Sequence, residues 1–400
     1  MSSANFLERL LDGAGVEWRE LGDVAHIKTG QLVNKHIISA KPGAYPVINS
    51  GREPLGYISE WNTDNDPIGI TTRGAGVGSV TWQEGKYYRG KLNYSVTVKA
   101  STPINTRYLY HLLLQMQPDI QALCTYDGIP ALNATNLKLL LIPIPCPENP
   151  KKSLAIQAEI VRILDSFTEL TAELTAELTA RKKQYAYYRD QLLSFEDCEV
   201  EWKTLGDERF FEVCSGGTPS KAKPEYWTSG SIPWLKSESC NNEPVYSASN
   251  YITDLGLKKS SAKLLSKDTT LIALVGATIF KTAYLEFEAT TNQNIASIKS
   301  KDAEVINDKF VFYYITNLYE KLKSEMHNYA MLNLTTLRQF TIPIPSHRAQ
   351  ARIVAILDKF DALTNSISEG LPREIALRQK QYEYYRDMLF SFPKPQEVAE

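Results

Sequence analysis

Two long stretches of the chain repeat their hydrophobic residues with the period of a coiled coil. Between residues 160 and 192, the seam positions follow in alternating steps of four and three, which predicts one long helix with a coiled-coil face. Residues 353–389 follow the same rhythm, except for two consecutive four-residue steps around Leu371, the pattern of a stutter. Because Gly370 and Pro372 flank that position, a kink or local break of the second helix is expected there.

The segments that precede these helices have a different pattern. Residues 16–145 and 200–345 are rich in Tyr, Thr, Val, Ile, Gly and Pro, with frequent turn signals. The predicted helices within them are 108–116 and 310–322. The predicted strands are Ile68–Thr72, Gly78–Trp82, Ser95–Lys99, Thr270–Val275 and Thr282–Phe287. The fold class is therefore α+β, with each half of the chain made of an α+β domain followed by one long helix.

The chain is an internal duplication. Residues 157–167, QAEIVRILDSF, recur as 350–360, QARIVAILDKF, with eight of eleven positions identical. Residues 181–195 recur in the same way as 378–392. Each repeat follows an Ile-Pro-Ile-Pro segment, and each half opens with Val-Glu-Trp and then Leu-Gly-Asp, whereas the interiors show little similarity. The expected boundaries are 1–150 for the first domain, 151–196 for the first long helix, 197–345 for the second domain, 346–393 for the second long helix and 394–400 for a tail.

Composition excludes several classes of protein. The 44 Lys and Arg against 46 Asp and Glu leave a net charge of −2, without the basic excess of a stand-alone nucleic-acid binder. The five cysteines are scattered and never spaced as CxxC, which disfavours a disulfide framework and a structural zinc site. Because the sequence has neither a membrane-span pattern nor a signal-peptide pattern, we expect a cytoplasmic protein.

The sequence also lacks a recognisable catalytic motif. It contains no phosphate-binding loop, no methyltransferase tetrapeptide of the NPPY or DPPY type, and no HExxH or GxSxG motif. Its five histidines are far apart and give no metal-ligand spacing. We therefore expect a chain that is not an enzyme and binds no metal.

The duplicated helices and the diverged domains indicate different kinds of partner. Two nearly identical helices suit two copies of one partner, related by an approximate two-fold axis. Two dissimilar domains at a fixed separation suit a long ligand with two different features, and duplex DNA meets that description.

Several motifs in register resemble those of one known family. They are the Ile-Pro-Ile-Pro lead-ins, the QAEIVRILD and QARIVAILD helix starts, the QYAYYRDQLLSF and QYEYYRDMLFSF helix ends, the two TAEL units of 171–178, GGTPS at 216–220 with the Tyr-Trp and Ile-Pro-Trp that follow it, and TTNQN at 290–294. Over essentially its whole length the chain resembles the specificity subunit of a type I restriction–modification system, most of all the type IC group. The first domain departs from the pattern, because it has His-Ile-Lys-Thr-Gly-Gln at 26–31 instead of GGTPS.

The resemblance implies a non-catalytic subunit with two target-recognition domains, one for each half of a split DNA site, joined by two long helices that form an antiparallel coiled coil. Two modification subunits would dock on the helices and methylate an adenine in each half-site with S-adenosylmethionine. Two restriction subunits would add translocation and cleavage that use ATP and Mg. This chain itself would bind none of these cofactors.

Direct readout of bases requires paired hydrogen-bonding groups, and phosphate contacts require cations or hydroxyls. The candidate DNA contacts of the first domain are Lys28, Gln31, Arg52, Arg73, Lys91 and Asn93. Those of the second domain are Thr218, Ser220, Lys221, Lys223, Lys236, Lys281, Asn292 and Gln293. Each of these residues could instead belong to a solvated turn, and Trp227 and Trp234 are interpreted as core anchors. Coiled-coil or partner-subunit packing is expected for Tyr185, Tyr188, Tyr382 and Tyr385.

Two other functions remain open from the sequence. The chain could be a coiled-coil scaffold that presents two unrelated ligand-binding domains, or an enzyme with an unrecognised site. Salt-dependent binding to a two-part duplex distinguishes DNA recognition from both.

Overall fold

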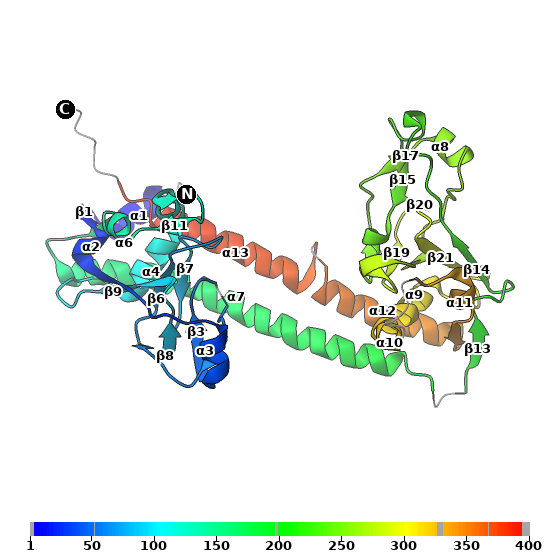
Figure 1. The fold of residues 1–400 in the computed structure, drawn as a ribbon, viewed down its shortest axis with the longest axis horizontal. Coiled ribbons are helices and arrows are strands. Elements are labelled where there is room, and N and C mark those ends of the chain that lie inside the picture. The colour runs from blue at the N-terminus through cyan, green and yellow to red at the C-terminus, as the bar shows by residue number, and fades with distance from the viewer. Residues whose placement is uncertain (1–3, 52, 197–198, 326–330, 367, 394–400) are drawn as a thin grey trace. The chain divides into compact units, whose positions relative to one another are not determined.

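The computed structural model describes residues 4–51, 53–196, 199–325, 331–366 and 368–393. The chain forms two compact units, one made of the residues up to Thr175 together with those from Glu374 onward, and the other of Ala176–Arg373. Each unit therefore contains one α+β domain, part of the first long helix and part of the second repeat's helical segment (Figure 1).

The domain of the first unit combines short helices with short strands. The helices of the domain are α1 (Ala4–Leu11), α2 (Leu21–Val24), α3 (Lys35–Ala40), α4 (Thr106–Gln115), α5 (Gln117–Ala122) and α6 (Ala134–Lys138). The strands are β1 (Val16–Glu20), β2 (Ala25–Thr29), β3 (Pro42–Ile48), β4 (Tyr57–Ile58), β5 (Thr63–Asp64), β6 (Ile68–Thr71), β7 (Val80–Trp82), β8 (Lys86–Arg89), β9 (Asn93–Val98), β10 (Cys124–Thr125), β11 (Ala131–Leu132) and β12 (Leu141–Pro145).

The second unit repeats this plan. Its domain has helices α8 (Asp254–Lys258), α9 (Asp308–Asn317), α10 (Tyr319–Glu325) and α11 (Leu334–Arg338), and the short 3-10 helices η1 (Pro224–Tyr226), η2 (Ser237–Ser239) and η3 (Gly276–Thr278). Its strands are β13 (Glu201–Thr204), β14 (Phe211–Ser215), β15 (Ile232–Leu235), β16 (Glu243–Val245), β17 (Tyr251–Ile252), β18 (Thr270–Ala273), β19 (Thr282–Leu285), β20 (Thr290–Thr291), β21 (Ile295–Ser300) and β22 (Thr341–Ile344).

Both domains have the same sheet topology. The main sheet has the strand order β2-β9-β6-β7 in the first domain and β14-β21-β18-β19 in the second, where β16 extends the edge. A smaller sheet has a central strand, β3 or β15, that pairs antiparallel with one neighbour and parallel with the other. The duplication therefore includes the interiors of the two halves, although their sequences hardly resemble each other.

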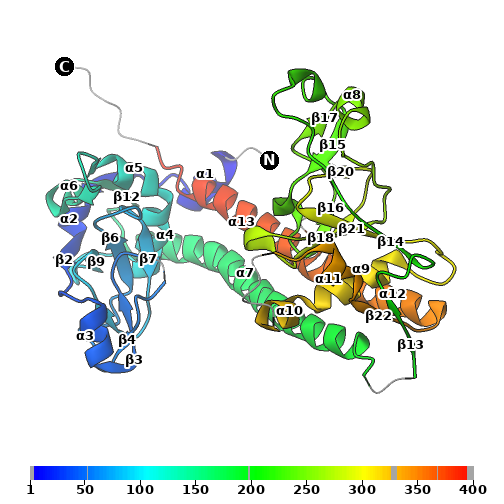
Figure 2. The same cartoon turned by 45° about the vertical axis from the view of Figure 1, so that its right-hand side comes forward.

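Each main sheet is covered by a predicted helix, although the predicted helix 310–322 is divided after Asn317 into α9 and α10. Helix α4 buries Leu109 and Leu112 in a core that includes Ile70 of β6. Helix α9 buries Phe310 and Phe312 in the equivalent core, and it lies against β18 and β19 (Figure 2). The five predicted strands correspond to β6, β7, β9, β18 and β19, so these predictions are confirmed.

The duplicated sequence motifs at the two ends of each half pair with each other. Strand β1 runs antiparallel to β12, with Trp18 opposite Pro143, and β13 runs antiparallel to β22, with Trp202 opposite Pro343. The Val-Glu-Trp openings and the Ile-Pro-Ile-Pro lead-ins are therefore alike in the two halves because they form the same two-stranded closure.

The first long helix, α7 (Pro150–Leu192), is continuous and about 65 Å long at 1.5 Å per residue. Its buried Gln157 accepts a hydrogen bond from the backbone N–H of Asn105 (2.8 Å), the residue that caps α4. In the second half, Gln350 accepts the same bond from Asn307 (2.8 Å) at the start of α9. The repeated glutamine thus fixes each domain to the helix that follows it.

The second helical segment is divided in two. Helix α12 (His347–Thr364) ends before α13 (Gly370–Leu389) begins, so the expected kink is a complete interruption. Gly370 has a φ of +75°, and a Cβ at this position would lie 2.3 Å from the carbonyl oxygen of Ala362. Only glycine fits this turn, which explains why the heptad pattern stutters there.

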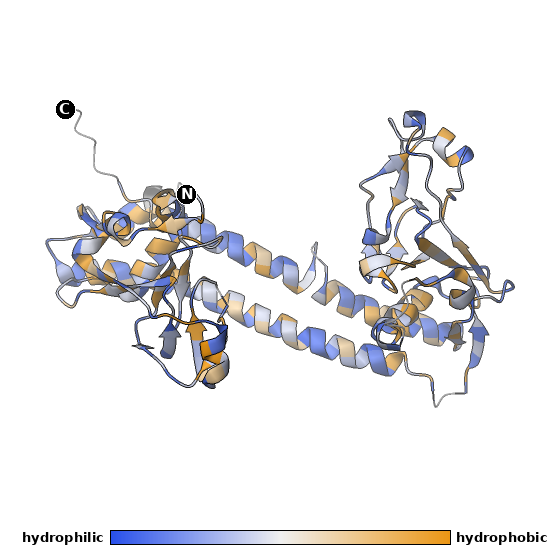
Figure 3. Ribbon diagram, viewed as in Figure 1, coloured by the Kyte–Doolittle hydropathy of each residue, from blue (hydrophilic) through white to orange (hydrophobic). Residues whose placement is uncertain are grey.

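The predicted coiled-coil contacts occur within each unit. In the first unit the ring of Phe167 on α7 stacks on Tyr385 of α13, with centroids 5.1 Å apart. In the second unit, Tyr185 on α7 stacks on Phe360 of α12, with centroids 5.7 Å apart. Along α7 and α13, hydrophobic and hydrophilic residues alternate (Figure 3), as expected for helices with one apolar seam.

Candidate nucleic-acid interface

The candidate residues of the first domain gather at one end of its main sheet. Gln31 follows β2, Arg73 follows β6 and Lys91 precedes β9, and all three side chains are exposed. These strand ends are neighbours, because β9 lies between β2 and β6 and Thr71 pairs with Asn93. The topology therefore brings together one amide and two cationic side chains that are far apart in the sequence.

Three candidate residues of the second domain lie at the equivalent end of its sheet. Thr218 follows β14, Gln293 precedes β21 and Lys281 directly precedes β19. The hydroxyl of Thr218 donates to the side-chain carbonyl of Gln293. The indole N–H of Trp234, whose side chain is buried, donates to Gly217 O (3.0 Å). Trp234 is thus a core anchor, as predicted, and it fixes the loop that carries Thr218.

The same backbone hydrogen bonds form at both sheet ends. They are Gly30 N to Asn93 O (3.3 Å) and Gln31 N to Arg89 O (3.0 Å) in the first domain, and Gly216 N to Ile295 O (3.2 Å) and Gly217 N to Thr291 O (2.8 Å) in the second. The first domain therefore places Gly30-Gln31 where the second has Gly216-Gly217. Lys91 and Gln293 occupy matching positions, two residues before β9 and β21.

Exposure divides the candidate residues into three groups. The exposed ones are Lys28, Gln31, Arg73, Lys91, Ser220, Lys221, Lys223 and Gln293, and the partly buried ones are Thr218, Lys236 and Lys281. Asn93 is completely buried and its Oδ1 accepts from Arg89, so its assignment as a DNA contact is corrected to a structural role. Asn292 is 8% exposed and its Oδ1 accepts from the backbone of Asn294, which also fits a structural role. Arg52 and the predicted tail 394–400 lie outside the described residues.

Arg89 lies in the basic segment Arg89-Gly90-Lys91 that the sequence offers as a possible DNA contact, but it organises the interior of the first domain. Its side chain is 3% exposed. The guanidinium donates to Asn93 Oδ1 (2.6 Å), to the carbonyls of Ile68 and Tyr94, and to the carbonyl of Asp66 (2.6 Å). Burial lowers the pKa of Arg89, although the group remains a cation at neutral pH. Arg89 and Lys91 are only two residues apart, and nothing in the sequence indicates that only Lys91 is exposed.

Arg89 also lines a polar pocket of about 360 Å³ beside the sheet end. Lys28, Gln31, Asn62 and Asp66 contribute to the same wall. The side-chain amide of Asn62 forms two hydrogen bonds with the backbone of Arg89. It accepts from Arg89 N (2.7 Å) and donates to Arg89 O (3.0 Å). Two of the predicted DNA contacts, Lys28 and Gln31, thus line a pocket whose wall includes the buried Arg89.

Further exposed lysines of the second domain lie on a segment that packs beside the segment of the predicted lysines. Helix α8 packs on η1 through the hydroxyl of Thr253, which donates to Glu225 O (2.8 Å). This contact brings the segment of Lys258, Lys259 and Lys263 to the segment of the predicted Lys221 and Lys223, and all five lysines are exposed. Lysines of this kind suit contacts to phosphates rather than to base edges. The run of two lysines and two serines that begins at the last residue of α8 was the available signal in the sequence.

Comparison with known proteins identifies the family. The model for the type I restriction modification DNA specificity domain matches residues 14–181 and again residues 199–377. The EcoR124I/EcoR124II specificity subunit of Escherichia coli is 40% identical over 100% of both chains. The EcoprrI specificity subunit of Escherichia coli is 32% identical over 92% of this chain and 93% of the relative. This chain belongs to the type I DNA specificity family.

The fold agrees with that assignment. The solved S subunit of a type I system from M. genitalium has a TM-score of 0.61 at 19% identity, and covers 96% of this chain and 98% of its own. A chain from a study of complex assembly and conformational transition of the type I R-M system also has a TM-score of 0.61, at 15% identity over 94% and 97%. As a specificity subunit, the chain is the non-catalytic, recognition component of its system.

The tyrosines predicted to bind a partner are mostly engaged within the specificity subunit. Tyr185 stacks on Phe360, and the hydroxyl of Tyr382 lies 3.0 Å from Nδ1 of His111. These two residues therefore have the internal packing that was one of the two expected roles, whereas Tyr188 and Tyr385 remain 42% and 37% exposed. Their neighbours Tyr187 and Tyr384 are more exposed, at 61% and 58%.

A buried polar junction joins the helices of the specificity subunit's first unit. His111 of α4 is completely buried, with Nε2 2.8 Å from Asp165 Oδ1 of α7. Arg107 Nε donates to the same oxygen (2.8 Å). In the second unit, Asp358 accepts instead from the hydroxyl of Tyr313 (2.6 Å). Both junctions use an aspartate at the repeated helix start, but only the first contains a histidine, the side chain whose ordinary pKa lies near neutral pH.

We expect the first junction to weaken in mild acid. Burial, outweighing the hydrogen bond to Asp165, lowers the pKa of His111 below its ordinary value. The unfolded chain then binds a proton that the folded unit excludes, so stability falls as the pH drops below about 6.5. His111→Tyr, which introduces the side chain of the second unit, should reduce this loss. Thermal unfolding at pH 7.5 and 5.5 measures it, and equal losses in the two proteins would contradict the role of His111.

The residues that the structure describes contain no group of three or more His, Cys, Asp or Glu side chains that could hold a metal ion. They also include no helix of the length and apolar character needed to cross a membrane.

Proposed function

We propose that this specificity subunit reads a bipartite duplex DNA site, with one half-site for each domain, and directs adenine-N6 methylation and restriction by partner subunits. The observation that carries the proposal is one sheet topology presenting different side chains at the same sheet end, Lys91 in the first domain and Gln293 in the second. A common scaffold with different hydrogen-bonding groups suits two different base sequences.

The contacts divide by chemistry. Gln31, Arg73, Lys91 and Gln293 are the exposed residues at the sheet ends that can bind base edges. The lysines around α8 and η1 are the phosphate contacts, and they supply the local positive charge that the chain as a whole lacks. The functional division into domains 1–150 and 197–345, with helices 151–196 and 346–393, belongs to the same proposal.

The partners follow from the duplicated helix ends. Two modification subunits dock on them, with Tyr187, Tyr188, Tyr384 and Tyr385 as exposed contact residues, and two restriction subunits complete the complex. S-adenosylmethionine, ATP and Mg belong to those partners, and the target adenine is turned out of the duplex into the modification subunit. The subunit acts in the cytoplasm, where the DNA is.

Selection of binding sites from random duplexes tests the function. The complex with modification subunits should enrich two fixed base sequences separated by a gap of constant length. Its affinity should fall steeply between 50 and 200 mM salt, by about a thousandfold for six phosphate contacts. A scaffold for unrelated ligands would enrich no duplex, and methylated adenines outside the selected sites would contradict the proposal.

Inserting a third TAEL unit after Leu178 should change the gap and nothing else. Four residues lengthen α7 by about 6 Å and turn it by about 40°, which corresponds to about one or two base pairs of duplex. Site selection with the variant should return the same half-sites with a longer gap. An unchanged gap would show that the length of α7 does not set the distance between the half-sites. Inserting four residues into an exposed loop serves as the control.

A further inference from the structure

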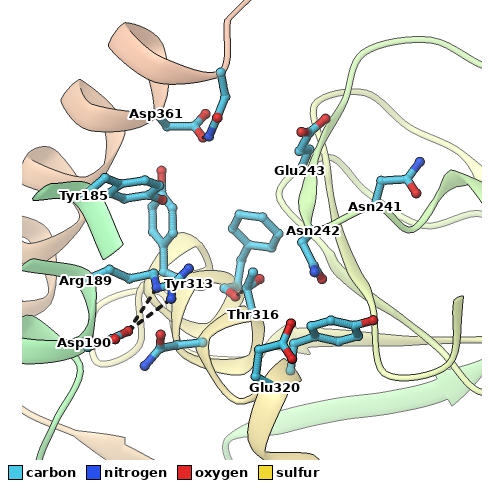
Figure 4. Close-up of a pocket in the computed structure, with 14 residues that line it drawn as sticks. Tyr185, Arg189, Asp190, Asn241, Asn242, Glu243, Tyr313, Thr316, Glu320 and Asp361 are labelled. Atoms are coloured by element: carbon cyan, nitrogen blue, oxygen red, sulfur yellow. Dashed lines mark hydrogen bonds and ion pairs between the residues drawn. The ribbon is translucent and has the colours of Figure 1, made fainter. Parts of the chain in front are cut away.

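A pocket in the second unit has no assigned role. It has a volume of about 570 Å³, and it is formed by the end of α7, the segment before β16, helices α9 and α10, and the end of α12. Figure 4 shows Glu243 and Asp361 on opposite sides of its opening, with Tyr185 beside Asp361 and Glu320 at its lower edge. This volume lies in the range of pockets that hold a ligand or side chains of another protein.

The pocket is electronegative. Among the described residues, Glu243, Glu320 and Asp361 form no ion pair, and the single cation in the wall, Arg189, is paired with Asp190 (3.1 Å). Burial and then the carboxylate of Asp361 raise the pKa of Tyr185. Asp361 accepts a hydrogen bond from the neutral side chain of Asn365 (2.9 Å), which leaves its charge uncompensated. A pocket with three carboxylates outside ion pairs repels DNA phosphates and attracts a cation.

The uncharged residues that line the pocket favour one kind of cation over another. Tyr185 and Tyr319 supply aromatic rings that already face cations of the same unit, Arg189 and Lys323, while Phe312 and Tyr313 are almost completely buried. Asn317 has a side-chain oxygen that is closed to solvent and accepts no hydrogen bond from the described residues. A guanidinium group stacks on aromatic rings and donates several hydrogen bonds in a plane, which suits this wall better than an ammonium group does. The chemistry therefore fits arginine.

The equivalent place in the first unit is built differently. The repeat keeps Tyr185, Arg189 and Asp190 as Tyr382, Arg386 and Asp387, but it replaces Asp361 and Asn365 by Thr168 and Ala172. Strand β16, which carries Glu243, has no counterpart in the main sheet of the first domain. The two helix ends therefore share their exposed tyrosines and differ in this acidic pocket.

We propose that the pocket receives an arginine-bearing segment of a modification subunit. The second unit therefore binds a modification subunit with higher affinity than the first unit does. The inference rests on the proposed function, because it assumes that two modification subunits dock on the two helix ends. The shared tyrosines then serve both copies, and the pocket adds charge-assisted contacts for one copy only. Assembly is consequently ordered, with the first copy bound at the second unit.

Stepwise titration of the full-length subunit with the modification subunit of its own system tests the inference. Native mass spectrometry and calorimetry should resolve two binding steps for the wild type. In the variant Glu243→Gln, Glu320→Gln, Asp361→Asn, the tighter step should weaken about tenfold or more, and the weaker step should not change. The matched control removes three exposed carboxylates of the same unit outside the pocket, through Glu208→Gln, Glu212→Gln and Glu304→Gln, and should bind like the wild type.

Glu243→Gln alone provides a second variant if the triple variant unfolds, because this side chain is exposed. It should weaken the tighter step a few-fold. Unchanged binding of both copies by the pocket variants would overturn the inference, as would a change in DNA affinity without any change in partner binding. A wild-type subunit that binds no modification subunit at all would instead overturn the proposed function, so the two failures are distinguishable.

Discussion

Replacing residues 208–331 by the corresponding core of another specificity subunit should change one half-site completely and leave the other half-site and the gap as they are. The exchanged segment contains the main sheet of the second domain and α9, but not the β13–β22 pair or the long helices. Because several base pairs are then mismatched at about 1–3 kcal/mol each, binding to the original second half-site should fall about a thousandfold or more. Site selection with the chimaera measures both half-sites at once.

The replacement must preserve the contacts at its ends. The backbone N–H of Leu332, outside the segment, donates to Leu274 O (2.8 Å), and Gln350 accepts from the cap residue Asn307 of α9, so the donor should supply equivalent residues. Replacing the segment by the same residues recoded at the DNA level is the control. A change in both half-sites would contradict separate readout by the two domains.

Arg89→Met should unfold the first domain at a much lower temperature than the wild type. The substitution leaves the side-chain oxygen of Asn93 and the carbonyls of Ile68, Tyr94 and Asp66 without their donor in a buried site. Removing one partner from such a network costs about 3–5 kcal/mol. Calorimetry should show an earlier transition for the first unit, and site selection should lose the first half-site while the second remains.

Lys41→Met is the matched control for Arg89→Met. Lys41 has the same charge and forms an exposed ion pair with Glu60 (2.6 Å), which contributes at most about 1 kcal/mol. A wild-type transition in Arg89→Met would show that the network does not hold the domain together. An unchanged first half-site in a folded Arg89→Met protein would show that the loops of Gln31 and Lys91 do not depend on it.

The helical part of the fold could be predicted because its signals are local or repeated. The heptad steps of 160–192 predict α7, and the near identity of 157–167 and 350–360 reveals that Gln157 and Gln350 serve the same purpose. The Gly370-Leu371-Pro372 stutter locates the break between α12 and α13. It does not give the extent of the break, which depends on how Gly370 packs against the carbonyl of Ala362.

The candidate interface could be predicted only in part. Polar residues next to turn signals, such as Gln31, Lys91 and Gln293, are exposed at the sheet ends, but the same pattern also selected Asn93, which is buried under Arg89. Lys258, Lys259 and Lys263 were missed because their relation to Lys221 and Lys223 depends on the packing of α8 on η1.

The sequence by itself determined the duplication, the long helices, the α+β class and the family, because each of these depends on local residue patterns or on segments that recur in both halves. The tertiary structure decided that the two dissimilar interiors share one sheet topology, which arginine is buried, and which carboxylates surround the pocket of the second unit. The physical reason is that burial and charge environment depend on neighbours that strand pairing and helix packing bring together from separate segments of the chain, and no local pattern of side chains encodes those neighbours.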